Sequence, residues 1–175
     1  ARRDTVFAGF GGEAAEGNGR RLFLYLGLET MSNVRVVTAP IAEPLSLTDA
    51  KLHLRVDSAD EDLLITALIT VARQYAENYT NRVFVQRTLE LLLQSFQQHC
   101  HSDGSIEIPY PPLQSVTSIK YLDLGGALQT LAASEYQVDV YRGPGLVKPA
   151  YLSTWPVTTR PDFNSVQIQY VAGYA

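Results

Sequence analysis

Residues 44–81, with the sequence PLSLTDAKLHLRVDSADEDLLITALITVARQYAENYTN, decide the fold because they predict two consecutive helices. Ser46 marks the start of the first helix, since its side chain can accept hydrogen bonds from the free backbone N–H groups of the first turn. Asp49 lies at the third helical position, where an acidic side chain can complete a capping box. We expect this helix to extend to about Val56.

The second helix is predicted to cover about residues 59–79. Ser58 and Glu61 have the spacing of a second capping box, and the acidic residues 60–62 place negative charge at the positive end of the helix dipole. If Ser58 is the cap, its replacement by alanine should cost about 1 kcal/mol of stability. Asn81 provides a residue that tolerates the left-handed conformation at the helix end.

This second helix carries more apolar surface than a helix packed on one sheet needs. At about 100° per residue, its apolar side chains span roughly 240° of the circumference, whereas roughly 100° is usual. The apolar arc consists of Leu63, Leu64, Ile65, Ala67, Leu68, Ile69, Val71, Ala72, Tyr75, Ala76 and Tyr79. The remaining polar strip consists of Asp62, Thr66, Thr70, Arg73 and Glu77.

Two interpretations of the apolar arc remain open. The helix could be wrapped by its own domain, or part of the arc could contact another subunit, as large exposed apolar surfaces commonly do. In the second interpretation, the predicted subunit interface consists of Leu63, Ile65, Ile69, Ala72 and Ala76.

Composition and charge restrict the possible functions. The chain has 175 residues, of which 46% are hydrophobic and 18% are charged, as in an ordinary globular protein. Its net charge of −4 gives no support for phosphate binding by bulk attraction, so DNA would be a passing neighbour. The single cysteine excludes an internal disulfide and suits a reducing cytoplasm. The sequence contains no apolar run long enough to cross a membrane.

Residues 1–30 differ from the rest of the sequence, because their glycines surround a charged stretch that has no periodicity. We expect this segment to be either a flexible arm or an extension upstream of a natural start at Met31. Residues 31–175 would then form one domain, with a helical part at 44–81 and a β part at 86–174.

The pattern changes after the helices from helical spacing to alternation. We predict strands at 34–37, 88–96, 106–108, 115–124, 136–140 and 166–170. Helices followed by strands, without alternation between the two, predict an α+β fold with an antiparallel sheet. The long segment Tyr141–Asn164 contains four prolines and is predicted to be a loop.

Candidate catalytic and metal-binding residues are few. His99, Cys100 and His101 are adjacent in a polar loop and have no second ligand cluster, so we predict that they hold no metal. His53 lies between two leucines on the first helix and is predicted to be a surface or boundary residue, not a base. The sequence also lacks a glycine-rich phosphate loop. We therefore predict no enzymatic activity and no cofactor.

Tyr151, Trp155 and Phe163 lie in the long predicted loop, and two interpretations are open for them. They could dock a partner protein, with Trp155 as a buried anchor, or Trp155 could cover its own sheet. The segment Pro109–Pro112 could likewise bind an aromatic groove, or its prolines could simply end a strand.

The order of these signals resembles the head–tail connector (adaptor) proteins of long-tailed phages, prophages and gene transfer agents. The resemblance covers residues 34–174 and is carried by five stretches, 43–57, 60–62, 79–82, 111–116 and 166–174. It implies a non-enzymatic ring of about twelve copies seated under the portal protein, with DNA passing through its lumen. A stopper or tail-completion protein would attach to the ring. The protein would lie in the virion neck after assembly in the host cytoplasm.

A protein of another class remains an alternative, namely a soluble ligand-binding β module with a helical lid. Trp155 and the tyrosines would line its pocket. Molecular mass would discriminate between the two, because a connector assembles into a large ring whereas a ligand-binding module stays small.

Overall fold

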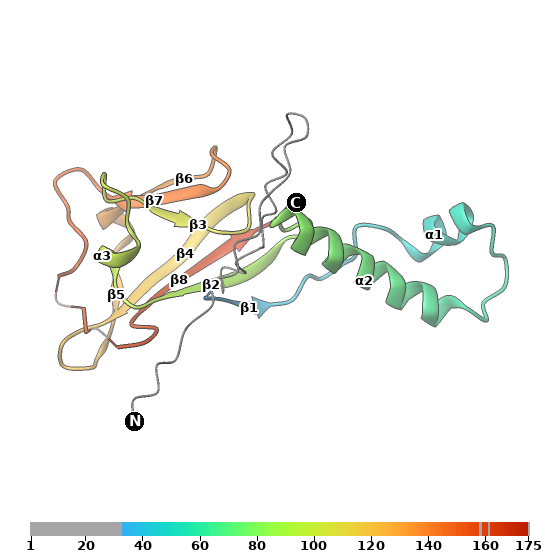
Figure 1. Cartoon of the computed structure of the whole chain (residues 1–175), viewed down its shortest axis with the longest axis horizontal. Helices are drawn as coiled ribbons and strands as arrows, with labels where there is room; N and C mark the ends of the chain where they lie inside the picture. Colours follow the sequence, from blue (N-terminus) through green and yellow to red (C-terminus); the bar gives the residue numbers. More distant parts are fainter. Residues whose placement is uncertain (1–32, 158, 161, 175) are drawn as a thin grey trace, which may run out of the picture. The chain divides into compact units, whose positions relative to one another are not determined.

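The computed structural model describes residues 33–157, 159–160 and 162–174 (Figure 1). The predicted α+β class is confirmed, because a helix pair is followed by antiparallel sheets. The arm or extension predicted at 1–30 lies outside the described residues. In chain order the elements are β1 (Val34–Thr38), α1 (Leu47–Leu54), α2 (Asp62–Thr80), β2 (Arg87–Leu93), α3 (Phe96–His99), β3 (Ile106–Ile108), β4 (Leu113–Leu122), β5 (Leu128–Leu131), a 3-10 turn η1 (Ala133–Glu135), β6 (Tyr136–Asp139), β7 (Gly145–Pro149) and β8 (Val166–Ala172).

The described strands form two antiparallel sheets. The larger sheet has the order β1-β2-β8-β4-β5, and the smaller sheet has the order β3-β7-β6. β8 is central in the larger sheet, where it pairs with β2 on one side and with β4 on the other. Its residues Val166, Ile168, Tyr170 and Ala172 are buried and the residues between them are half-buried, as the alternating sequence pattern predicts.

Both sheets contribute to one hydrophobic core. Phe96 of α3, Ile106 of β3 and Ile168 of β8 are all fully buried in the same cluster. Gly145 of β7 lies against Leu113 of β4, and a Cβ atom at this glycine would overlap with the leucine side chain. The absence of a side chain at Gly145 therefore allows the two sheets to approach closely.

The structure contains two strands, β5 and β7, that the sequence pattern does not predict. β7 lies inside the segment 141–164, which was expected to be a loop because of its prolines. Pro144 precedes this strand and Pro149 ends it, so neither proline interrupts its pairing. The strand predicted at 88–96 ends three residues early, because Ser95 caps the short helix α3 by accepting a backbone hydrogen bond.

α1 has the predicted start, and both helices have left-handed ends. The Ser46 hydroxyl accepts a hydrogen bond from the Asp49 backbone N–H at 3.1 Å, which confirms the first cap. α1 ends slightly before the predicted position, where Arg55 adopts a φ of 58°. α2 ends as predicted at Asn81, which has a φ of 52°.

The predicted start of α2 is wrong by three residues. The helix begins at Asp62, and Glu61 at the N-cap position makes no side-chain capping bond. The Nζ atom of Lys51 donates to the Ser58 carbonyl oxygen at 2.7 Å and to the Asp62 carboxylate at 2.6 Å. These two contacts of Lys51 hold the segment between α1 and α2 in a turn. The N-cap position of α2 is therefore occupied by Glu61 and not by Ser58.

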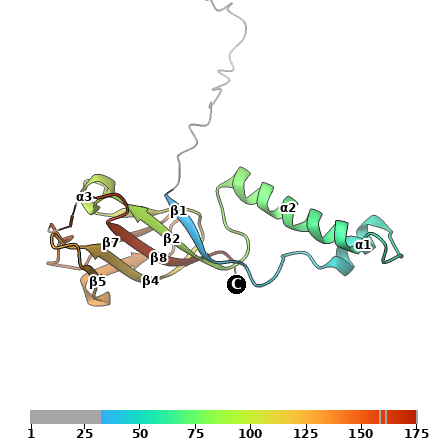
Figure 2. The ribbon, with the colours of Figure 1, turned by 90° about the horizontal axis from the view of Figure 1, so that it is seen from below.

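α1 and α2 pack against each other, and each buries one apolar residue, Ala50 on α1 and Ile65 on α2. Figures 1 and 2 show α1 beside the N-terminal end of α2. Neither helix is packed extensively on a strand. Among the described residues, no helix has the length and apolar character needed to span a membrane.

The two serines at the predicted caps provide a matched pair of substitutions. Ser46→Ala should lower the free energy of unfolding by about 1 kcal/mol, because it removes the acceptor for the first turn of α1. Ser58→Ala should stay within about 0.5 kcal/mol of the wild type, because only the backbone carbonyl of Ser58 is used. Urea unfolding of the two variants measures both values, and an equal loss in each would contradict the observed start of α2.

Candidate assembly interface on helix α2

The side of α2 that faces its own chain is the polar strip. Arg73 is only 7% exposed and Glu77 only 4% exposed, and both belong to the polar strip. Thr70 of the same strip is half-buried. Most of the large side chains of the apolar arc are exposed, so the chain does not wrap this helix.

Six large apolar side chains of α2 are between 55% and 88% exposed. They are Leu63, Leu64, Leu68, Val71, Tyr75 and Tyr79. The rings of Tyr75 and Tyr79 stack on each other, with centroids 6.4 Å apart. Because full burial of one such side chain stabilises a protein by about 1.5–3 kcal/mol, this face retains a large driving force for association. We call these six residues the exposed face of α2.

The residues predicted to form the subunit interface have different positions on the helix. Leu63 and Ala72 are exposed, whereas Ile69 and Ala76 are half-buried. Ile65 is 4% exposed and is therefore buried within its own chain. The surface available to a neighbour is therefore centred on the exposed face rather than on the stripe that contains Ile65.

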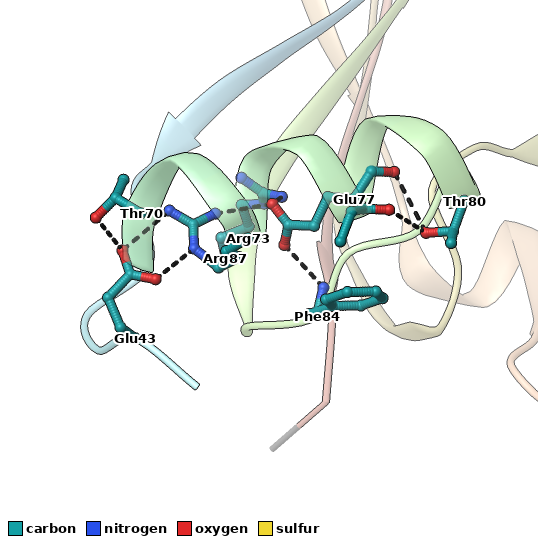
Figure 3. A network of polar contacts seen from close by, with 8 residues as sticks. Glu43, Thr70, Arg73, Glu77, Thr80, Phe84 and Arg87 are labelled. Atoms are coloured by element: carbon teal, nitrogen blue, oxygen red, sulfur yellow. Dashed lines mark hydrogen bonds and ion pairs between the residues drawn. The ribbon is translucent and has the colours of Figure 1, made fainter. Parts of the chain in front are cut away.

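A network of charged side chains surrounds the buried polar strip of α2, on the side of the helix away from the exposed face (Figure 3). Arg73 donates through Nε and Nη2 to the two carboxylate oxygens of Glu43, at 2.6 and 3.2 Å. Thr70 donates its hydroxyl to Glu43 at 2.9 Å. The paired guanidinium–carboxylate geometry fixes the linker that precedes α1 against the middle of α2.

Glu77 connects α2 to the larger sheet. Its carboxylate accepts a hydrogen bond from Arg73 at 2.8 Å and from the Phe84 backbone N–H at 2.8 Å, and it forms an ion pair with Arg87 of β2 at 2.7 Å (Figure 3). With Glu43, these residues form a neutral set of two acids and two arginines. We call Glu43, Arg73, Glu77 and Arg87 the charge network.

The contact between Glu43 and Arg73 stabilises the charged forms of these two residues. The hydrogen bonds from Arg73 lower the pKa of the Glu43 carboxyl below its ordinary value. The same hydrogen bonds to Glu43 raise the pKa of the Arg73 guanidinium. Both groups are therefore ionised at neutral pH, and their contact is an ion pair.

A cavity of about 160 Å³ lies where α2 meets the larger sheet. Its polar lining includes Glu77 and Arg87 of the charge network. Its apolar lining comes from four side chains on β1, β2 and the segment that follows α2, namely Val34, Val36, Val83 and Leu89. Apolar side chains of the sheet thus lie close to α2 but face its polar side.

Of the two interpretations of Trp155, its burial favours the one in which it covers its own sheet. Trp155 is only 7% exposed, and its ring stacks on Phe96 with centroids 4.7 Å apart. Its indole N–H donates to the Gly104 carbonyl oxygen at 2.7 Å. Trp155 therefore covers its own core, whereas Tyr151 and Phe163 are each 87% exposed and remain available to a partner.

The histidines and the cysteine lie apart from the exposed face. His99 ends α3, and Cys100 is half-buried and pairs through its backbone with Ile106. His101 lies 3.8 Å from Glu107, and His53 is exposed on α1. Within the part of the chain that the structure describes, no three histidine, cysteine or acidic residues are grouped as metal ligands.

Sequence reasoning missed the role of Glu43 and Arg87 and the inward orientation of the polar strip. The spacing of Arg73 and Glu77, four residues apart on an otherwise apolar helix, was the available signal. Glu43 lies 30 residues before Arg73, and no local pattern connects them.

Comparison with known proteins identifies a family whose model matches the helix pair. Residues 44–121 match the phage gp6-like head-tail connector protein family. The predicted resemblance to head–tail connectors is thereby confirmed, and the matching region contains α1, α2 and the charge network apart from Glu43. No curated protein sequence matches the chain significantly.

Solved structures resemble the connector-like fold over most of the chain. "Neck of empty GTA particle computed with C6 symmetry" has a TM-score of 0.64 and 20% identity, and covers 81% of this chain and 71% of that one. "Virion of native gene transfer agent (GTA) particle" has a TM-score of 0.60 and 23% identity, with the same coverage. "Neck of native GTA particle computed with C12 symmetry" has a TM-score of 0.53 and 19% identity, with 79% and 70% covered. At these identities, the likeness shows a shared fold.

Trp155→Ala should reduce the free energy of unfolding by about 3–5 kcal/mol, because it removes a buried ring that stacks on Phe96. Phe163→Ala, at an exposed aromatic in the same segment, should change it by less than about 0.5 kcal/mol. Chemical denaturation measures both changes. A stable Trp155→Ala variant would contradict the structural role assigned to this side chain.

The Glu43 carboxyl should make stability depend on pH. Its pKa is lowered in the folded state, so its contribution is complete above the unfolded pKa and is lost as the pH falls through the folded pKa. The difference in unfolding free energy between wild type and Glu43→Gln should therefore be constant from neutral pH to about pH 5, and shrink at lower pH. Urea unfolding across this range provides the measurement. A difference that persists undiminished to about pH 3 would exclude this origin.

Proposed function

We propose that this protein is a structural component of a phage-like particle, a head–tail connector in the neck between the portal and the tail. Two findings support this function. The family match includes the whole helix pair, and the similar folds come from structures of gene transfer agent necks and virions. A structural role of this kind needs no catalytic site, so the protein is proposed to be a non-enzyme.

The exposed face of α2 is the observation that carries the proposal. A single copy leaves these six apolar side chains in water, and repeated copies around an axis could cover them. Two of the similar neck structures are described with C6 and C12 symmetry. A ring of about twelve copies is consistent with both observations.

Neighbouring neck proteins are the proposed partners of this ring. The portal protein would contact one side, and a stopper or tail-completion protein the other, with Tyr151 and Phe163 as candidate contacts. DNA would pass through the lumen without specific binding, because a net charge of −4 favours weak contact with phosphates. Assembly would take place in the host cytoplasm, and the ring would reside in the virion neck.

The alternative function, a ligand-binding β module with a helical lid, required Trp155 to line a pocket. Trp155 is instead buried against Phe96, and neither α1 nor α2 covers a sheet extensively. The connector function is therefore the better supported of the two.

A double substitution on the exposed face tests the ring. Leu68→Asp with Val71→Asp should abolish association beyond the monomer, because charges in a desolvated contact are strongly unfavourable. The thermal stability should hardly change, since both side chains are exposed. Leu124→Asp, at an exposed leucine in the turn after β4, is the matched control and should assemble like the wild type. Light scattering after size exclusion gives the masses, and a double variant with the mass of the wild type would refute the interface.

A further inference from the structure

Two apolar surfaces of this chain lie close together without packing on each other. One is the exposed face of α2, which points away from the chain. The other is the apolar part of the cavity wall, where Val36 of β1 is still 54% exposed. Glu77 and Asn78, near the C-terminal end of α2, line the same cavity, so this end of the helix lies at its rim.

The hydrophobic effect alone would favour a different orientation of α2. Val71 lies about 160° around the helix from Arg73, so roughly half a turn about the helix axis would bring the apolar side chains in the C-terminal half of α2 toward the cavity. Such a rotation would bury apolar surface of α2 and of β1 within one chain. It would also remove the face that is available to another molecule.

The charge network opposes this rotation from two directions. Arg73 is held by two hydrogen bonds to Glu43 in the linker before α1. Glu77 is held by Arg87 and by the Phe84 backbone N–H, which lie on the sheet side. Rotation of α2 would break both sets of contacts and leave buried charges without partners, which is strongly unfavourable.

We propose that Glu43, Arg73, Glu77 and Arg87 are positioning residues, which hold the exposed face of α2 away from the chain's own sheet and present it to a second copy. The orienting role follows from the contacts of the charge network. The identity of the occupant, a second copy, rests on the proposed function. The two parts are separable by experiment.

The orienting role is tested by the accessibility of a thiol on the exposed face. Val71→Cys is introduced in a Cys100→Ser background, and its labelling rate with a soluble thiol reagent is measured at concentrations at which the protein is monomeric. The test variant neutralises the network through Glu43→Gln, Arg73→Met, Glu77→Gln and Arg87→Met. Glutamine is chosen to replace Glu77 because its amide oxygen can still accept from the Phe84 N–H.

A second ion pair provides the matched control. Arg35 of β1 pairs with Glu90 of β2, and neither residue contacts α2 through a described hydrogen bond or ion pair. Arg35→Met with Glu90→Gln therefore removes an ion pair between elements and leaves the charge network intact. The control should label as fast as the parent, whereas the neutralised variant should label at least about tenfold more slowly, because its α2 turns the apolar side inward.

The consequence for assembly is measured without the Val71→Cys probe. The control should form rings like the wild type, and the neutralised variant should show at least an approximately tenfold lower ring population at the same concentration. Circular dichroism should show that its helix content is retained. If the fourfold variant does not fold, the labelling rate and the ring population are measured for Glu77→Gln alone.

Each result has a definite meaning. Labelling as fast as the parent in a folded neutralised variant overturns the orienting role. Slower labelling with unchanged ring formation overturns the link between orientation and the second copy. A wild-type protein that never assembles refutes the proposed ring, while the labelling rates still decide the orienting role.

Discussion

The carboxylate of Glu77 is the contact on which the arrangement of this chain depends. It accepts from Arg73 on its own helix, pairs with Arg87 on β2, and accepts from the backbone at Phe84. Together with the Glu43–Arg73 pair, it joins the linker, the helix and the larger sheet. Little of α2 lies close to the strands, so this polar contact has a large part in how the helix is held.

A charge network of this kind is a poor means of gaining stability. Removing ionised groups from water is costly, and well-packed apolar residues of similar volume often stabilise as much or more. The network is also incomplete, because the buried Nε of Arg87 has no hydrogen-bond partner among the described residues. The charge network can instead constrain the orientation of α2, because hydrogen bonds between charged groups require a defined geometry whereas apolar contacts do not. This property is consistent with a role in orientation.

Local signals in the sequence predicted the parts of the fold that local interactions determine. Alternation identified β8, and the cap at Ser46 and the left-handed Asn81 marked helix ends, because each depends on residues only a few positions apart. The second cap was mispredicted because Lys51 on the preceding helix bridges to Asp62.

Features that depend on distant residues could not be predicted from sequence patterns. The apolar arc of α2 was identified correctly, but helical periodicity does not reveal which side of a helix faces its own chain. That choice depends on Glu43 and Arg87, whose pairing with α2 arises only in the folded chain. Trp155 was equally ambiguous, because its stacking partner Phe96 lies far earlier in the sequence, in a helix that the alternating pattern does not predict.

The closure of a ring explains why a connector would hold an apolar helix on a polar base. In a cyclic assembly every copy repeats the same contact, so an angular error at one interface recurs at each of the others and the ring fails to close. Apolar contacts supply affinity, but they tolerate many orientations. A helix fixed by directional ion pairs before association would meet its neighbour at a defined angle, and its apolar side chains could then supply the affinity. In the proposed ring, the separation of these two tasks between the buried strip and the exposed face of one helix would account for the inverted polarity of α2.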